Sequence, residues 1–249
     1  MRVFNSLDPQ QLIVLCLAGL LVLPGCDSGS APEIRSVPLP DPIDPSNFPA
    51  QVDVFNPLFP LRPGLVTRTT GQSAGGEEVV LVEVTDETRT VQGVVTTVVR
   101  DRVWVDGELV EDTDDWFAQD ADGNVWYFGE DVEDFENGVV ISTAGSWESG
   151  VDGAMAGIIM HANPRSGSVY RQEYYRGEAE DIGEVIAVGR TIDVPAGTFT
   201  DCVLIEDTTP LEPDVRESKY FCPGVGNALT IDHSEGDARF ELVEVTFPE

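Results

Sequence analysis

The chain has 249 residues, with 14 Lys and Arg against 45 Asp and Glu, which gives a formal net charge of −31. This length suits one large domain, and a hydrophobic fraction of 41% allows it a core. The negative charge excludes a general nucleic-acid binder, because such proteins need basic surface to neutralise phosphates. Two histidines and four cysteines also argue against a His-rich transition-metal site.

Residues 1–25 have the pattern of a secretory signal. Arg2 precedes an apolar run from Leu12 to Leu23, which is shorter than the roughly 20 residues of a membrane-spanning helix. The sequence Leu23-Pro24-Gly25-Cys26 then resembles the lipobox of bacterial lipoproteins, although Pro24 is less usual there. The resemblance implies that Cys26 becomes the N-terminus and carries fatty acyl chains such as palmitate. An ordinary signal peptide that contains a cysteine is the alternative.

This likeness places the chain in the bacterial cell envelope, lipid-anchored to a membrane and facing the periplasm or the exterior. Residues 26–63 are rich in proline, as in Val37-Pro38-Leu39-Pro40, and we expect an extended tether there. The apolar residues at the end of the tether, Phe55 to Leu61, are expected to dock on the folded domain.

Residues 64–249 are expected to form a single antiparallel β domain. Runs of β-branched residues such as Val79–Val84 favour strands, and Asp106-Gly107 is typical of a two-residue hairpin turn. Ten or so sequential strands with short turns predict an all-β antiparallel meander that forms a closed or partly open barrel. A two-sheet sandwich is the alternative.

Two cysteines, Cys202 and Cys222, lie within this domain and are 20 residues apart. In an exported protein such a pair most often forms a disulfide, and we expect one here.

Asp120, Asp122 and Asn124 stand at alternate positions around Gly123. Oxygen ligands with this spacing can bind a hard cation, and calcium is the one cofactor that the sequence suggests. The alternative is a hairpin turn, in which Asp and Asn side chains bond the local backbone and Gly takes a positive φ. The acidic runs Glu111–Asp115, Glu130–Glu136 and Glu178–Glu184 are interpreted as solvated loops.

Aromatic residues cluster in the domain, and adjacent ones in a strand point to opposite faces. We therefore expect one face to line a ligand groove that includes Trp126, Phe128, Tyr174 and Tyr175. The alternatives are that these aromatics belong to the core, or that they dock the apolar end of the tether. The chain also resembles a family of secreted and lipid-anchored bacterial β proteins without an established activity, through the segments Asp112–Asp131, Gly145–Glu148, Tyr170–Tyr175, Val194–Phe199 and Tyr220–Gly226. A looser architectural similarity is to the half-open barrels of the lipoprotein-carrier superfamily, which bind acyl chains.

The sequence favours non-enzymatic binding of an apolar ligand or an envelope partner protein over catalysis, and no catalytic residue is assigned. One alternative is a calcium-dependent structural or adhesion module. Another is an envelope hydrolase that acts through carboxylates or His161, although no Gly-x-Ser-x-Gly elbow occurs.

Overall fold

A computed structural model of the chain describes residues 37–49 and 54–248. The predicted all-β fold is confirmed, because these residues form fifteen strands and one short 3-10 helix, η1 (Pro45–Asn47). The first seven strands are β1 (Val66–Ser73), β2 (Gly76–Val91), β3 (Val94–Val105), β4 (Glu108–Gln119), β5 (Val125–Glu136), β6 (Val139–Ser142) and β7 (Trp147–Glu148). The remaining strands are β8 (Met155–Met160), β9 (Val169–Arg171), β10 (Glu173–Tyr174), β11 (Ile182–Val194), β12 (Gly197–Thr208), β13 (Arg216–Cys222), β14 (Gly226–Asp232) and β15 (Ala238–Thr246).

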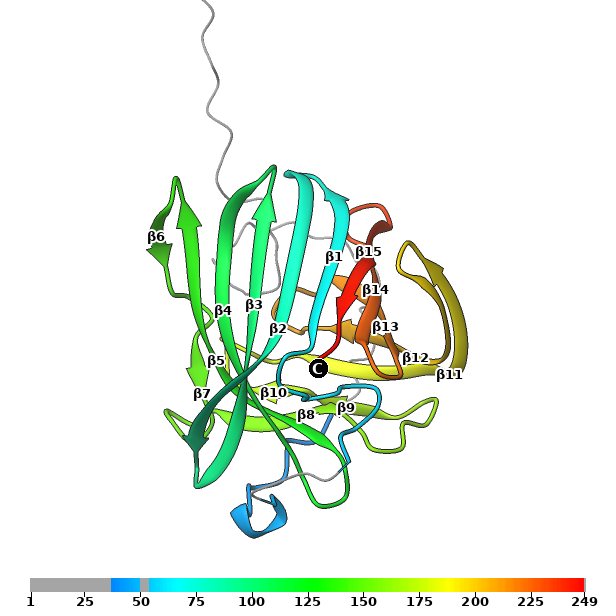
Figure 1. Ribbon diagram of the computed structural model, residues 1–249. Helices are drawn as coiled ribbons and strands as arrows, with labels where there is room; N and C mark the ends of the chain where they lie inside the picture. Colours follow the sequence, from blue (N-terminus) through cyan, green and yellow to red (C-terminus); the bar gives the residue numbers. More distant parts are fainter. Residues whose placement is uncertain (1–36, 50–53, 249) are drawn as a thin grey trace, which may run out of the picture.

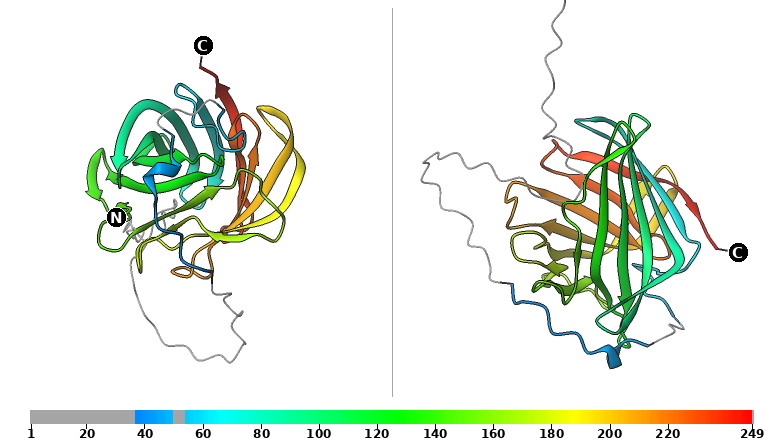
Figure 2. Two further views of the ribbon diagram at one scale, coloured as in Figure 1. Left: turned by 90° about the horizontal axis from the view of Figure 1, so that it is seen from below. Right: turned by 90° about the vertical axis from the view of Figure 1, so that its left-hand side faces the viewer.

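All fifteen strands belong to one antiparallel sheet with the order β10-β8-β5-β4-β3-β2-β1-β15-β14-β13-β12-β11-β9, and β6 and β7 pair with β5. Most neighbours are consecutive in the chain, as expected of a meander. The exception that joins the two halves is the pairing of β1 with β15, in which Val66 lies opposite Thr246. The sheet curls strongly, so that β1–β5 and β11–β14 face each other (Figures 1 and 2).

The expectation of a closed barrel is wrong, because the sheet keeps two free ends, β10 and β9. These end strands follow each other along the chain with only Gln172 between them. The backbone N–H of Gln172 donates to Asp181 O, and its side chain donates to Asp207 Oδ1 at 3.0 Å. The two end strands are therefore connected through the chain at Gln172 and its hydrogen bonds. No ladder of backbone hydrogen bonds pairs β9 with β10. The two-sheet sandwich is not adopted either.

Tight turns set the register of the long strands. Asp106 and Gly107 both have positive φ, 50° and 84°, and form the predicted two-residue turn between β3 and β4. Gln92-Gly93 and Asn137-Gly138 repeat this conformation in the neighbouring hairpins. Such turns match the right-handed twist of the strands that they connect.

The sheet buries side chains on both faces, as adjacent residues of β4 and β5 illustrate. Phe117 and Tyr127 belong to the main core, which includes Val99, Val185, Ile205 and Phe221. Their chain neighbours Trp116 and Phe128 point to the opposite face and pack with Val91, Val94 and Val98. A third cluster surrounds the disulfide cysteines on β12 and β13.

The segment before β1 contacts both faces. The Phe48 ring meets those of Trp126 and Phe128 edge-on, with centroids 6.0 and 5.4 Å apart. Farther along, Leu58 and Leu61 are buried in the main core. This end of the segment thus packs as part of the domain. Within the described residues, no helix is long and apolar enough to cross a membrane.

Candidate functional site: an acidic cavity inside the curved sheet

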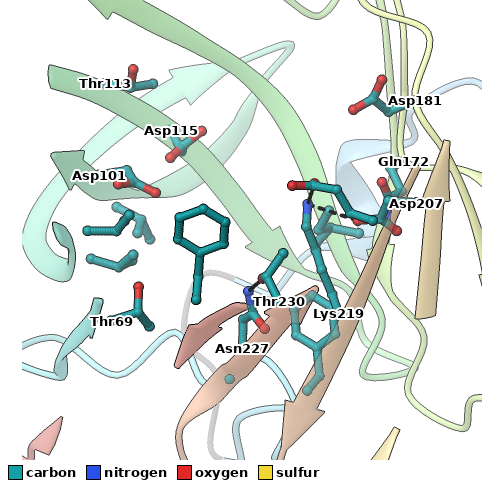
Figure 3. Close-up of a pocket in the computed structure, with 18 of the residues that line it drawn as sticks. Thr69, Asp101, Thr113, Asp115, Gln172, Asp181, Asp207, Lys219, Asn227 and Thr230 are labelled. Atoms are coloured by element: carbon teal, nitrogen blue, oxygen red, sulfur yellow. Dashed lines mark hydrogen bonds and ion pairs between the residues drawn. The ribbon is translucent and has the colours of Figure 1, made fainter. Parts of the chain in front are cut away.

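A cavity of about 390 Å³ lies inside the curved sheet. Inward-facing side chains of β1–β5 and of β12–β15 line it, together with Phe59 and Pro60 from the segment before β1. Figure 3 shows Asp101 and Asp115 on one side of the cavity and Lys219 on the other. The volume lies within the roughly 300–1,000 Å³ that is typical of small-molecule sites.

Strand alternation decides which side chains reach the cavity. In β3, the residues Val99, Asp101 and Val103 line it. Arg100 lies between two of them and points away, where its guanidinium forms a bidentate pair with Asp112. The inner face of β3 thus carries a carboxylate between two valines.

The acidic run Glu111–Asp115 is part of strand β4, so its interpretation as a solvated loop is wrong. Glu111, Thr113 and Asp115 line the cavity, whereas Asp112 and Asp114 alternate with them and are not part of its lining. Thr113 Oγ1 donates to Glu111 Oε1 at 2.9 Å, and Tyr127 OH donates to Asp115 Oδ1 at 2.5 Å. A residue of the same strand thus fixes Glu111, and a residue of β5 fixes Asp115.

Aromatic rings form the apolar part of the cavity wall. Phe117 stacks on Tyr127 with centroids 4.7 Å apart, and Phe59 lies 4.9 Å from Phe117. Phe59 also approaches Phe221 of β13, at 6.3 Å. Since Phe59 precedes β1, the end of the predicted tether supplies part of the wall. Valines of β2, namely Val80, Val82 and Val84, extend this apolar surface.

Carboxylates dominate the polar part of the lining. Twelve of the described lining residues are acidic: Glu78, Asp101, Glu111, Asp115, Glu130, Glu173, Asp181, Asp207, Glu212, Glu217, Asp232 and Glu235. Burial raises the pKa of Glu78, of Glu111 and of Asp115 to about 7. Burial also raises the pKa of Asp101 well above its usual value, and the nearby charges of Asp115 and Glu111 add to the effect. The fold therefore holds these groups in a site that disfavours their negative charge.

Lys219 is the one basic residue among the described residues of the lining. Its Nζ lies 3.0 Å from Asp207 Oδ2 and 3.1 Å from Glu217 Oε2. These two carboxylates raise the pKa of Lys219 despite its burial, so the ammonium is charged and paired. Gln172 Nε2 donates to the other oxygen of Asp207, which ties this group to the ends of the sheet.

Two buried oxygens in the lining accept no hydrogen bond, Asp101 Oδ1 and Asn227 Oδ1. The amide nitrogen of Asn227 is used, because it donates to Thr230 Oγ1 at 2.8 Å. Both unsatisfied atoms are acceptors, and a buried acceptor without a donor is costly. A guest that brings N–H or O–H donors can therefore satisfy these two acceptors.

The four residues predicted to line a groove lie outside this cavity. Phe128 is fully buried beneath Phe48, and Trp126 Nε1 donates to Asp120 Oδ2 at 2.9 Å. The Arg171 guanidinium lies 4.8 Å from the Tyr174 ring centroid, and Tyr175 packs against the main core. Phe48 of the predicted tether thus occupies the face that Trp126 and Phe128 share.

The predicted cation ligands form a turn between β4 and β5. Asp120 Oδ1 accepts from the backbone N–H groups of Asp122 and Asn124, and Oδ2 accepts from Asn124 Nδ2 and Trp126 Nε1. Asn124 Oδ1 accepts from Ala162 N. These oxygens thus serve the turn, and calcium binding there stays a prediction. Within residues 37–49 and 54–248, no group of three or more His, Cys, Asp or Glu residues could hold a metal ion.

The predicted disulfide is confirmed: Cys202 of β12 bonds Cys222 of β13, and both residues are fully buried. Such a bond is typical of proteins that fold in oxidising compartments outside the cytoplasm. The predicted lipidation site, Cys26, lies outside the described residues.

The two histidines lie in different settings. His161 packs edge-on against Tyr170, and burial lowers its pKa. His233, by contrast, joins two polar partners that the sequence did not connect with it. Ser218 Oγ lies 2.9 Å from His233 Nε2, and His233 Nδ1 lies 2.5 Å from Asp237 Oδ1. This is the order of contacts found in a Ser–His–Asp relay.

The chain has distant structural similarity to two solved bacterial proteins. No family model matches the chain, and no curated protein matches it. A candidate lipoprotein from Parabacteroides distasonis aligns with a TM-score of 0.44 and 15% identity, over 78% of this chain and 100% of that one. A candidate exported protein with a YmcC-like fold from Bacteroides fragilis aligns with a TM-score of 0.43 and 14% identity, over 76% and 98% of the two chains.

Sequence reasoning missed the acidic cavity. One signal was present: Val99-Arg100-Asp101-Arg102-Val103 alternates two valines and an acid on one face with arginines on the other. An acid on the valine face of a strand indicates a polar interior site. The acids of β4 gave no such signal, since Asp112 and Asp114 have the same chemistry as their inward-facing neighbours.

Proposed function

We propose that this chain is a binding protein of the bacterial cell envelope that holds a small amphiphilic molecule in the acidic cavity. The observation that carries the proposal is the cavity itself, which combines an aromatic and valine-lined wall with unsatisfied polar groups. The resemblance of Leu23-Pro24-Gly25-Cys26 to a lipobox and the disulfide between Cys202 and Cys222 support an exported protein.

The energetics of the cavity lining support this function. Burial disfavours the charge of carboxylates such as Glu111 and Asp115, which is seen in their raised pKa values. A ligand that covers the apolar wall and pairs with the acids would offset this cost.

A blocking substitution tests this proposal. Val82 faces the cavity from β2, so Val82→Trp fills the apolar part with an indole ring. Val188→Trp is the matched control, because Val188 is exposed on β11. Binding of a neutral apolar dye, N-phenyl-1-naphthylamine, is measured by fluorescence on a soluble form that begins at Asp27 and retains every described residue.

We expect the unmodified chain and Val188→Trp to bind one dye molecule each, and Val82→Trp to lose at least tenfold in affinity. Absence of dye binding, or equal binding by all three proteins, would contradict the proposal.

The Ser218–His233–Asp237 relay favours hydrolysis of an ester as a second candidate function. In this reaction Ser218 Oγ attacks the ester carbonyl, and its proton passes to His233 Nε2 and then to the leaving alcohol. Water then attacks the acyl-serine, one of its protons passes through His233 to Ser218 Oγ, and the carboxylic acid leaves. A fluorophosphonate probe tests this candidate: it should label the unmodified chain and spare Ser218→Ala, with Ser234→Ala as control. An unlabelled chain would retire it.

A further inference from the structure

The cavity has a strong excess of acidic groups over basic ones. Its single described lysine, Lys219, is already paired with Asp207 and Glu217. Figure 3 shows Asp101 and Asp115 on the opposite wall, and Glu111 lines the cavity from the same strand as Asp115. These three acids have no basic residue beside them in the described lining. An anionic guest would face this wall without a free cation to receive it.

Asp101 is the acid best placed to receive a guest. It stands in the middle of β3, and Figure 3 shows its carboxylate beside the cavity. Its Oδ1 atom is buried and accepts no hydrogen bond, although nearly all buried polar atoms in proteins have a partner. A guest that brings a positively charged donor would supply the missing partner, because it favours the ionised carboxylate, which only accepts hydrogen bonds.

Asp115 lies close enough to share that donor. Asp101 is opposite Thr113 in the β3–β4 ladder, and Asp115 is two residues beyond Thr113 on the same face. Such diagonal neighbours are roughly 7–8 Å apart between Cα atoms, which lets one ammonium group lie between the two carboxylates. Tyr127 OH fixes one oxygen of Asp115 and leaves the other available to a guest.

The surroundings favour an organic cation over a metal ion. The described residues hold no group of three or more potential metal ligands, whereas Val80, Val82 and Val103 border the acids with apolar surface. A metal ion gains no binding free energy from apolar surface, whereas the alkyl chain of an amine would be buried against it.

On the basis of the proposed function, we infer that the guest of the cavity is a cationic amphiphile, a primary amine with an alkyl chain. Its ammonium group bonds Asp101 and Asp115, and its chain lies along the valines of β2 and β3.

A set of probes with one chain length tests the inference. Octylamine, octanol and octanoate share an eight-carbon chain and differ in charge, so their affinities isolate the role of the ammonium group. Calorimetric titration is performed at pH 8 on the unmodified chain, on Asp101→Asn/Asp115→Asn, and on Asp131→Asn/Glu133→Asn as control. Asp131 and Glu133 are exposed on β5, so the control removes two negative charges outside the cavity, as many as the other variant removes inside it.

We expect octylamine to bind at least tenfold more tightly than octanol and at least a hundredfold more tightly than octanoate. The preference should persist in the β5 control and disappear in Asp101→Asn/Asp115→Asn, which should still bind octanol. Equal binding of octylamine and octanol by the unmodified chain would overturn this inference and leave the proposed function intact. Failure of all three probes, together with failure of the neutral dye, would overturn both.

Discussion

Lys219 Nζ lies 3.0 Å from Asp207 Oδ2 on the adjacent strand, and both side chains are almost fully withdrawn from solvent. The same ammonium contacts Glu217, so one cation holds two buried carboxylates at the wall of the cavity. Removing one partner of a buried ion pair typically costs about 3–5 kcal/mol, because the remaining charge is left uncompensated. This lysine therefore neutralises buried negative charge on both β12 and β13.

We expect Lys219→Met to lower the free energy of unfolding by about 3 kcal/mol or more at pH 8. The loss should be smaller at pH 5, because burial raises the pKa of Glu217 and protonation then removes one of the repelling charges. Urea unfolding at both pH values measures the effect. Arg216→Met is the control: Arg216 pairs with Glu206 at the surface, and its loss should cost at most about 1 kcal/mol. Equal losses for the two variants would contradict the prediction.

The unliganded chain should become less stable as the pH rises. Glu78, Glu111 and Asp115 have folded-state pKa values of about 7, above their ordinary values of 4.5, 4.5 and 3.8. The folded state therefore binds more protons than the unfolded state between about pH 4 and pH 7, and stability falls with pH across that window. This contribution is fully present below pH 4 and is lost as the pH passes 7.

Thermal unfolding at pH 5 and pH 8 measures this dependence. We expect the midpoint to be higher at pH 5 by several degrees, and Glu111→Gln to reduce the difference because Gln carries no charge at either pH. A midpoint that is higher at pH 8, or a difference that Glu111→Gln leaves unchanged, would count against the account of the buried acids.

The turn at Asp120 should behave as a structural element. Asp120→Ala removes the acceptor of four donors, including the Trp126 indole, and should cost roughly 2 kcal/mol or more. Asp122→Ala should cost less than about 0.5 kcal/mol, because the Asp122 side chain is exposed. Thermal melts with excess chelator and with millimolar Ca²⁺ complete the test. A calcium-dependent shift that Asp122→Ala abolishes would restore the cation site.

Local sequence signals predicted much of the fold. The β-branched runs and the Asp106-Gly107 turn specify strands and hairpins from nearby residues alone. The pairing of Val66 with Thr246 joins opposite ends of the domain, and no local signal specifies it. Curvature and sheet ends depend on such distant pairings, so the sequence predicted a closed or partly open barrel without deciding whether the sheet closes, and the structure shows a sheet with free ends.

The candidate site was harder to predict for the same reason. Whether Glu111 or Asp112 faces the interior depends on the register of β4 against β3, and a shift of one residue would exchange them. Adjacent aromatics of β5 point to opposite faces of the sheet, as strand alternation predicts. Phe48 covers one face, and Tyr127 between Trp126 and Phe128 reaches the cavity on the other.

The disulfide should contribute substantially to stability. Cys202 and Cys222 close a loop of 20 residues, and the chain-entropy model gives about 3 kcal/mol for a ring of this size. We expect Cys202→Ala/Cys222→Ala to lose about this amount in urea unfolding, and the reducing agent dithiothreitol to have no further effect on the variant. A loss of unfolding free energy below about 1 kcal/mol would contradict this prediction, because β12 and β13 would then be stable without the disulfide.

A crystal structure of the chain grown with octylamine tests most directly whether the cavity holds a cationic amphiphile. We predict density for one octylamine inside the curved sheet, with its nitrogen within hydrogen-bond distance of Asp101 Oδ1 and its chain against Val82. A cavity that contains only water at a saturating concentration of octylamine, or octylamine bound only at the outer surface, would contradict the account.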